Sequence, residues 1–158
     1  MRREPRILVV FGVVALLFAV SSTVASASGL HYKIAPTFTV DSTNNTVTAT
    51  GEVAGAGTSI NASLTASYTF TVTCNNPGAD AGPVPGKTGS GSTSGSELNI
   101  PSDHGNAYFD VTTAPATENT SGLCKKGWTA NPGPITFVSA TLTITSSNGG
   151  TLTTTYPL

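Results

Sequence analysis

One stretch of strict alternation, Ile60–Cys74, restricts the folds available to this chain more than any other feature. Every even position in it is apolar, and every odd position is Asn, Ser or Thr. A period of two puts the apolar side chains on one face of a strand, so the stretch predicts a half-buried strand. Because it is longer than most strands, we expect it to bend, or to split near Ala66 and pass from one sheet to another.

A second alternating segment lies near the C-terminus, at Val138, Ala140, Leu142 and Ile144. Apolar residues just before it, Ile135 and Phe137, fall on odd positions instead. Such a change of phase predicts a β-bulge or an entry bend. The glycine-rich turn at 148–150 then predicts a hairpin with a last strand over 152–156.

Weaker strand signals complete an all-β pattern. They lie at 37–40, 46–53, 107–113 and 128–130, and the residues at 41–45 form a turn signal. Threonine supplies 26 and serine 14 of the 131 residues from position 28 onward, and Thr suits an exposed pleated surface. About seven strands and no periodic helix predict one domain over 28–158, an immunoglobulin-like two-sheet β-sandwich.

The segment Asn75–Ser96 is rich in Pro, Gly, Ser and Asn. Its composition and length predict a mobile surface loop, of the kind that carries function in some proteins and is merely tolerated in others.

The chain has two cysteines, Cys74 and Cys124. In an exported protein a lone pair of this kind predicts an intramolecular disulfide. A catalytic thiol or a metal-binding pair is the alternative, although there is no CxxC spacing.

The N-terminus has the layout of a secretory signal. Arg2, Arg3 and Arg6 precede the apolar run Ile7–Val20, and small residues follow at Ala25 and Ala27. We predict a signal peptide over 1–27 and a secreted, extracellular product with no stable membrane span; the alternative is an uncleaved anchor.

Charge excludes one class of partner. From residue 28 onward, four lysines stand against seven acidic residues, a net charge of −3, which is unsuited to nucleic acid. Lys125 and Lys126 form the one basic cluster, beside the single tryptophan, Trp128. These three residues are the candidate ligand contacts, with Trp128 either stacking on a ligand or packing against the disulfide.

The sequence does not predict an enzyme or a cofactor. No G-x-S-x-G elbow occurs, although Asp103 and His104 form an adjacent acid and imidazole pair. The metal candidates are His31 and His104, which would suit copper if His31 stood at or near the mature N-terminus.

Three segments, 71–78, 109–115 and 137–143, resemble those of a group of secreted, Thr-rich and largely actinobacterial proteins, in the same order. The resemblance implies export from a bacterium and implies no ligand. The predicted function is therefore a secreted, non-enzymatic binding or surface module of the cell envelope, whose partner is a wall polymer or another surface protein. The alternatives are a wall component that self-assembles through the uncharged C-terminal hairpin, and a small copper-binding or hydrolytic protein.

Overall fold

The computed structural model describes residues 29–78 and 82–158, and this part of the chain contains strands but no helix. The predicted signal segment 1–27 lies outside the described residues. The strands are β1 His31–Asp41, β2 Thr46–Ala54, β3 Ser59–Asn75, β4 Val84–Pro85, β5 Gly89–Pro101, β6 Asn106–Thr112, β7 Thr129–Ser146 and β8 Thr151–Pro157.

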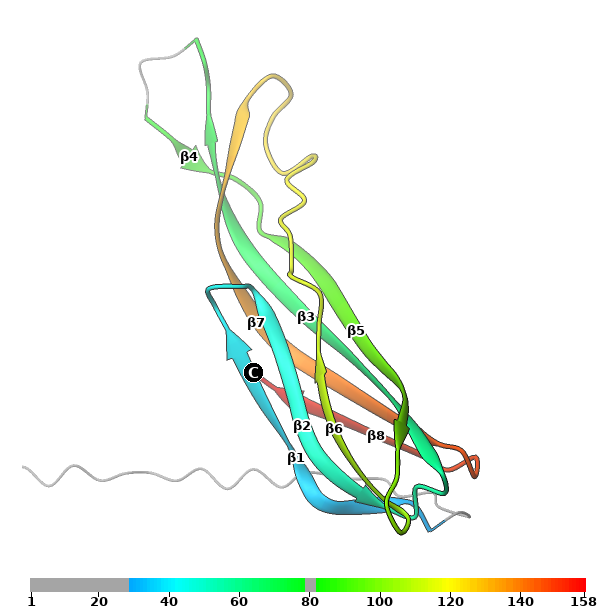
Figure 1. Cartoon of the computed structure of the whole chain (residues 1–158). Helices are drawn as coiled ribbons and strands as arrows, with labels where there is room; N and C mark the ends of the chain where they lie inside the picture. The colour runs from blue at the N-terminus through cyan, green and yellow to red at the C-terminus, as the bar shows by residue number, and fades with distance from the viewer. Residues whose placement is uncertain (1–28, 79–81) are drawn as a thin grey trace, which may run out of the picture.

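The strands form two facing antiparallel sheets (Figure 1). The larger has β3 and β7 at its centre, β8 at one edge, and both β4 and β5 along the other side of β3. The smaller sheet has the order β1-β2-β6. The predicted all-β, two-sheet architecture is confirmed, with eight strands against about seven expected; the immunoglobulin-like topology stays a prediction.

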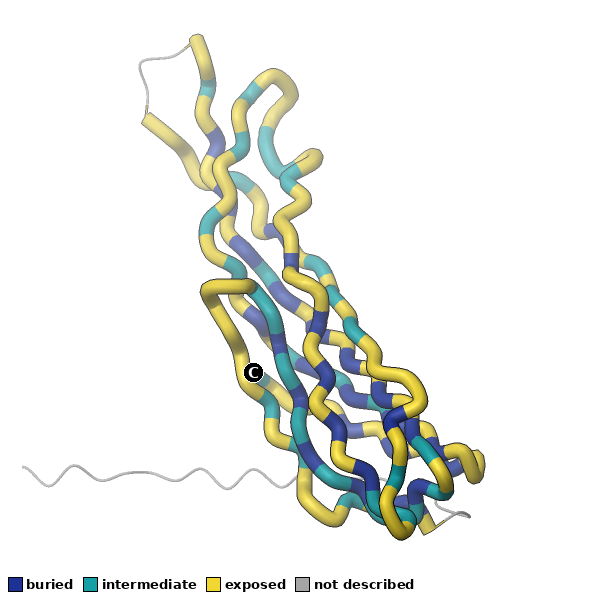
Figure 2. Tube along the Cα trace, in the orientation of Figure 1, coloured by how far each residue is buried: buried dark blue, intermediate teal, exposed yellow. Residues whose placement is uncertain are grey.

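The alternation of β3 is confirmed along its whole length. Its even-numbered residues are buried and its odd-numbered ones face outward, as the stripes in Figure 2 show. Ile60 and Leu64 meet Leu142 and Ile144 of β7 in the core, which Phe109 and Val47 close from the smaller sheet. The expected split near Ala66 is wrong. β3 stays in one sheet because β7 and β5 flank it continuously.

The predicted bulge is confirmed at Val138 on β7. Phe137 pairs with Tyr68 and Ser139 with Ser67, so Val138 is the extra residue, and it is 49% exposed. The bulge returns Phe137 to the core face, where its ring meets the Tyr68 ring edge-on at a centroid distance of 5.9 Å. The phase change in the sequence therefore marks the place where β7 adjusts its register.

The reading of 75–96 as a loop is wrong for its second half. Gly89–Ser96 is the start of β5, which runs antiparallel to β3. Gly89 pairs with Phe70 and Gly91 with Tyr68, and a Cβ on either glycine would collide with the aromatic ring opposite. These glycines are thus core-facing positions over which the rings of β3 lie, a known way of stabilising glycine within a strand.

The β1–β2 hairpin carries its own turn chemistry. The Asp41 carboxylate accepts a hydrogen bond from the Asn44 side chain at 2.7 Å and others from the backbone N–H groups of Thr43 and Asn44. These bonds, that from the Asn44 side chain first, lower the pKa of Asp41. The strand and turn signals at 37–53 are confirmed.

β1 packs over β8 across the sandwich. The rings of Phe38 and Tyr156 stack at 5.2 Å, and the Tyr32 hydroxyl lies 3.0 Å from Thr154 Oγ1. Burial raises the pKa of Tyr32, and the hydrogen bond with Thr154 opposes the shift in part. This side of the sandwich is therefore held by side chains, with no backbone pairing between the two sheets.

The smaller sheet does not cover the whole of the larger one (Figure 1). The chain after β6 runs on along the uncovered part of β3 and β7. It leads toward the tip of the molecule, which is the end of the larger sheet where β3 ends and β7 begins. Backbone and side-chain bonds hold it there, from Ala116 N to Asn45 O and from the Tyr68 hydroxyl to Thr117 O, each 2.8 Å long. This connection places the loop 120–128 at the tip.

Candidate functional site

A disulfide anchors the tip of the sandwich. Cys74, at the end of β3, is bonded to Cys124, with 5.7 Å between the two Cα atoms. The predicted disulfide is confirmed. Disulfides are typical of proteins that fold outside the reducing cytosol, so the protein is a non-cytoplasmic one. Among the described residues there is no helix long and apolar enough to cross a membrane.

A third segment joins the tip beside the disulfide. Lys87 N donates to Leu123 O at 3.1 Å, and Gly86 N donates to Val72 O at 2.7 Å. The short strand β4 lies just before these residues and pairs with the end of β3. Three segments that are distant in sequence are thus tied to one another at the end of the molecule.

Trp128 sits at the end of a tight turn in this tip. Its backbone N–H donates to Lys125 O at 3.0 Å, and Gly127 supplies the positive φ of 85° that the turn requires. The indole is half-buried against the edge of the core, and it also lines two depressions in the surface. Trp128 therefore packs partly against the core, and its contact with a ligand stays a prediction.

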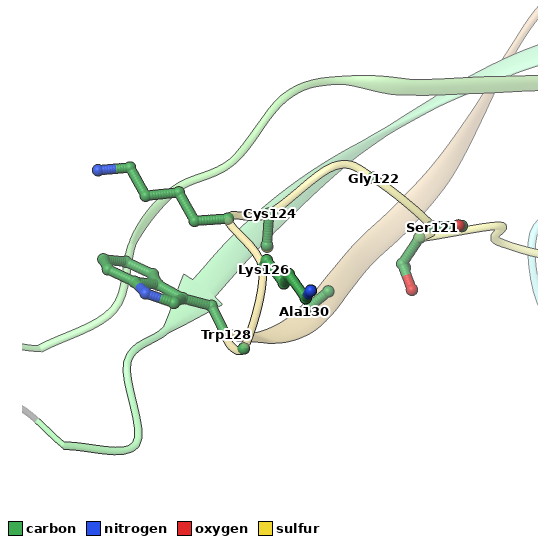
Figure 3. Close-up of a pocket in the computed structure, with 9 residues that line it drawn as sticks. Ser121, Gly122, Cys124, Lys126, Trp128 and Ala130 are labelled. Carbon is green, nitrogen blue, oxygen red and sulfur yellow. The ribbon is translucent and has the colours of Figure 1, made fainter.

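A cation meets the indole. Lys125 Nζ lies 5.5 Å from the centroid of the Trp128 ring, within the range of a cation–π interaction. Figure 3 shows the indole of Trp128 projecting from the loop beside Cys124, with Lys126 nearby. The contact holds a positive charge next to an aromatic surface.

The two depressions adjoin each other, with volumes of about 500 and 600 Å³. They share Gly122, Cys124, Lys125 and Trp128 as lining residues. Lys126 lines the first and Lys87 the second, so three of the four lysines of the sequence gather at one tip. Of the described residues, no Asp or Glu lines either depression.

The sequence predicts Lys125, Lys126 and Trp128 as candidate ligand contacts but does not indicate Lys87. Lys87 lies in the segment read as a loop, and no local motif connects it with the others. The bond from Lys87 to Leu123 and the disulfide beside it bring Lys87 to the tip. The predicted pairing of Cys74 with Cys124 was the one signal that could have indicated this.

The metal candidates lie at the opposite end of the sandwich. His31 begins β1, where its Nδ1–H donates to Gly29 O at 2.7 Å. His104 lies in the turn between β5 and β6, with its Nδ1 2.6 Å from Asp103 Oδ1. Among residues 29–78 and 82–158, no group of three or more His, Cys, Asp or Glu side chains is placed to hold a metal ion.

The Asp103–His104 pair is open to solvent. The two side chains are 93% and 90% exposed, in a turn where His104 has a φ of 50°. General acid–base sites usually lie in a partly buried cleft, where fixed neighbours hold the acid and the base in place. The geometry of this turn therefore adds no support for a hydrolytic function.

No protein-family model, curated protein or solved structure matches this chain.

Proposed function

We propose that the protein is an exported, non-enzymatic binding module of a bacterial cell envelope, and that its disulfide-anchored tip binds an anionic wall polymer. One observation carries this proposal. Lys87, Lys125 and Lys126 gather around Trp128, with no acidic residue among the described lining residues, in a domain whose overall charge is negative.

Charge supports an anionic ligand. The basic tip stands out in an acidic molecule, and opposite charges raise the local concentration of a ligand at such a patch. Single exposed lysines contribute little to binding, about 0.2–1 kcal/mol each. A polymer with repeated phosphate or carboxylate groups engages several of them at once, which multiplies small contributions.

The indole supplies the second part of the interaction. Trp128 offers a wide apolar surface with a polar N–H, a combination suited to the C–H face of a sugar ring and its hydroxyls. Because the turn 125–128 and the disulfide fix the loop, little conformational entropy is lost when a ligand binds there. The predicted signal segment and the disulfide both support an exported location.

We expect the folded, oxidised protein to be retained on an anionic polysaccharide such as polygalacturonate, or on poly(glycerol phosphate), and not on neutral dextran. Retention should fall as salt is raised. The variant Trp128→Ala should bind about 30-fold more weakly, because central aromatic anchors contribute about 2 kcal/mol or more. The double variant Lys125→Gln, Lys126→Gln should lose about tenfold.

Two residues away from the tip provide matched controls. Tyr108→Ala removes an aromatic ring that is 59% exposed on β6, and Lys33→Gln removes the fourth lysine, which pairs with Glu52 at 2.8 Å. Both controls should bind like the unaltered protein, with folding of every variant checked by circular dichroism. An equal loss of binding from Lys33→Gln and from the double variant Lys125→Gln, Lys126→Gln would refute the proposed site. So would a folded protein that neither anionic polymer retains.

A further inference from the structure

We infer that the protein forms a two-fold dimer by antiparallel pairing of β8 with β8 of a second copy, so that the two larger sheets become one continuous sheet. β8 is the last strand of the larger sheet, and among the described residues it pairs with β7 alone. The dimer does not require the Trp128 tip to bind a polymer.

The backbone of β8 offers free hydrogen-bonding groups in a regular row. Leu158 N donates to Val138 O at 3.0 Å, and Gly150 O accepts from Ser146 N at 2.8 Å. Hydrogen-bonded positions alternate along an antiparallel strand, so the even-numbered residues of β8 direct their N–H and C=O groups toward β7. Thr151, Thr153 and Thr155 then direct theirs away from the sheet.

The outer edges of β1 and β5 are protected. β1 contains Lys33, Pro36 and Asp41 and has two register shifts, all features that hinder pairing with another strand. The edge of β5 is covered by the chain after β6, where Ala114 N donates to Ser94 O at 2.9 Å. β8 has no charged residue and no register shift.

The sequence of β8 is complementary to itself in one register. With Thr153 opposite Thr153 of the second copy, Thr151 lies opposite Thr155 of that copy, and all three outward N–H groups meet outward C=O groups. Pro157, which has no N–H, falls opposite Gly149 in the turn and lies beyond the ladder. A register shifted by one residue on each strand would set Pro157 against Thr151 and leave the Thr151 C=O without a donor.

Side chains support the same register. On the inner face it places Tyr156, which is 42% exposed, beside Gly150 of the second copy, and an aromatic ring across from glycine stabilises a β-pair. On the outer face, the Thr hydroxyls of β7 and β8 already form cross-strand pairs, such as Thr141 with Thr155 at 2.9 Å. Pairing β8 with its copy extends these uncharged rows across the two-fold axis without placing like charges together.

The variant Thr153→Pro tests the dimer at its centre. It removes the outward N–H of Thr153 from both copies, and with them two hydrogen bonds across the two-fold axis. It removes no backbone hydrogen bond to β7, and the weak hydroxyl contact with Thr143 Oγ1 at 3.5 Å is lost equally in Thr153→Val, so the monomer should still fold. Sedimentation equilibrium from micromolar to millimolar concentration should show a weak dimer for the unaltered protein, as the small interface implies. The dissociation constant should rise at least about tenfold in Thr153→Pro and stay unchanged in Thr153→Val, which keeps the N–H.

Hydrogen exchange provides a test that needs no variant. In the full-length protein, expressed with its own N-terminal segment and with Cys74 and Cys124 oxidised, exchange at the Thr151, Thr153 and Thr155 amides should slow as the concentration rises. The amides of Leu152 and Thr154 should be protected at every concentration. A protein that stays monomeric at millimolar concentration, or a dimer that Thr153→Pro leaves unchanged, would overturn the inference.

Discussion

Replacing both cysteines, Cys74→Ala with Cys124→Ala, should lower the free energy of unfolding by about 4 kcal/mol. The bridge spans a sequence separation of 50, and it restricts the conformations open to the unfolded chain. Removing it raises the conformational entropy of the unfolded chain and so favours unfolding. Net stabilities of single domains are about 5–15 kcal/mol, so the variant should be close to unfolding at moderate temperature. Urea denaturation followed by far-ultraviolet circular dichroism measures the change.

The reduced protein is the matched control for this prediction. A reductant should destabilise the original chain by a similar amount and should leave the double variant unaffected. The tip should also lose order, because the disulfide ties the loop around Trp128 to β3. A loss below about 1 kcal/mol would contradict the account, because it would mean that the bridge barely restricts the unfolded chain.

Gly95→Ala should destabilise the protein by about 3 kcal/mol, the upper part of the range for overpacked cores. A Cβ on Gly95 would meet the backbone carbonyl of Thr112, at the point where the end of β6 passes over β5. Next to this contact, Ala114 N donates to Ser94 O and Thr93 Oγ1 donates to Ala114 O, so the backbone there is held in place. Thermal unfolding at neutral pH gives the shift in the midpoint.

Gly82→Ala is the matched control for the glycine prediction. A Cβ at position 82 would meet no atom within 4 Å, and the residue is exposed. Its stability should stay within about 0.5 kcal/mol of the original. Equal effects from the two substitutions would show that Gly95 does not mark a close approach of the two sheets.

The parts of the fold that could be predicted are those in which alternating apolar and polar side chains indicate the buried face of a strand. β3 and β7 alternate between apolar and hydroxyl residues, and the phase change before Val138 locates the bulge. Fifteen alternating residues suggested a bend into a second sheet, yet β5 and β7 pair with β3 along its length and keep it in one. The local pattern predicts the strand, but pairing with the neighbouring strands determines that β3 stays in one sheet.

β5 could not be predicted for a different physical reason. Glycine at the core-facing positions of β5 contributes no hydrophobic signal, and its role is defined by Phe70 and Tyr68 on the neighbouring strand. A pattern of Gly and Ser therefore predicts a loop, although Gly89–Ser96 alternates between more and less buried positions. The same limitation hid Lys87, whose place at the tip depends on contacts with residues beyond position 120.

Titration of the single tryptophan with an anionic wall polymer tests the proposed function most directly. Trp128 is the only tryptophan in the sequence, so its fluorescence reports on the tip alone. We predict a saturable change in emission with poly(glycerol phosphate) or polygalacturonate that weakens as salt is added, and no change with dextran. If the emission of the folded, oxidised protein stays unchanged in the titrations with both anionic polymers, that result would contradict binding at this tip.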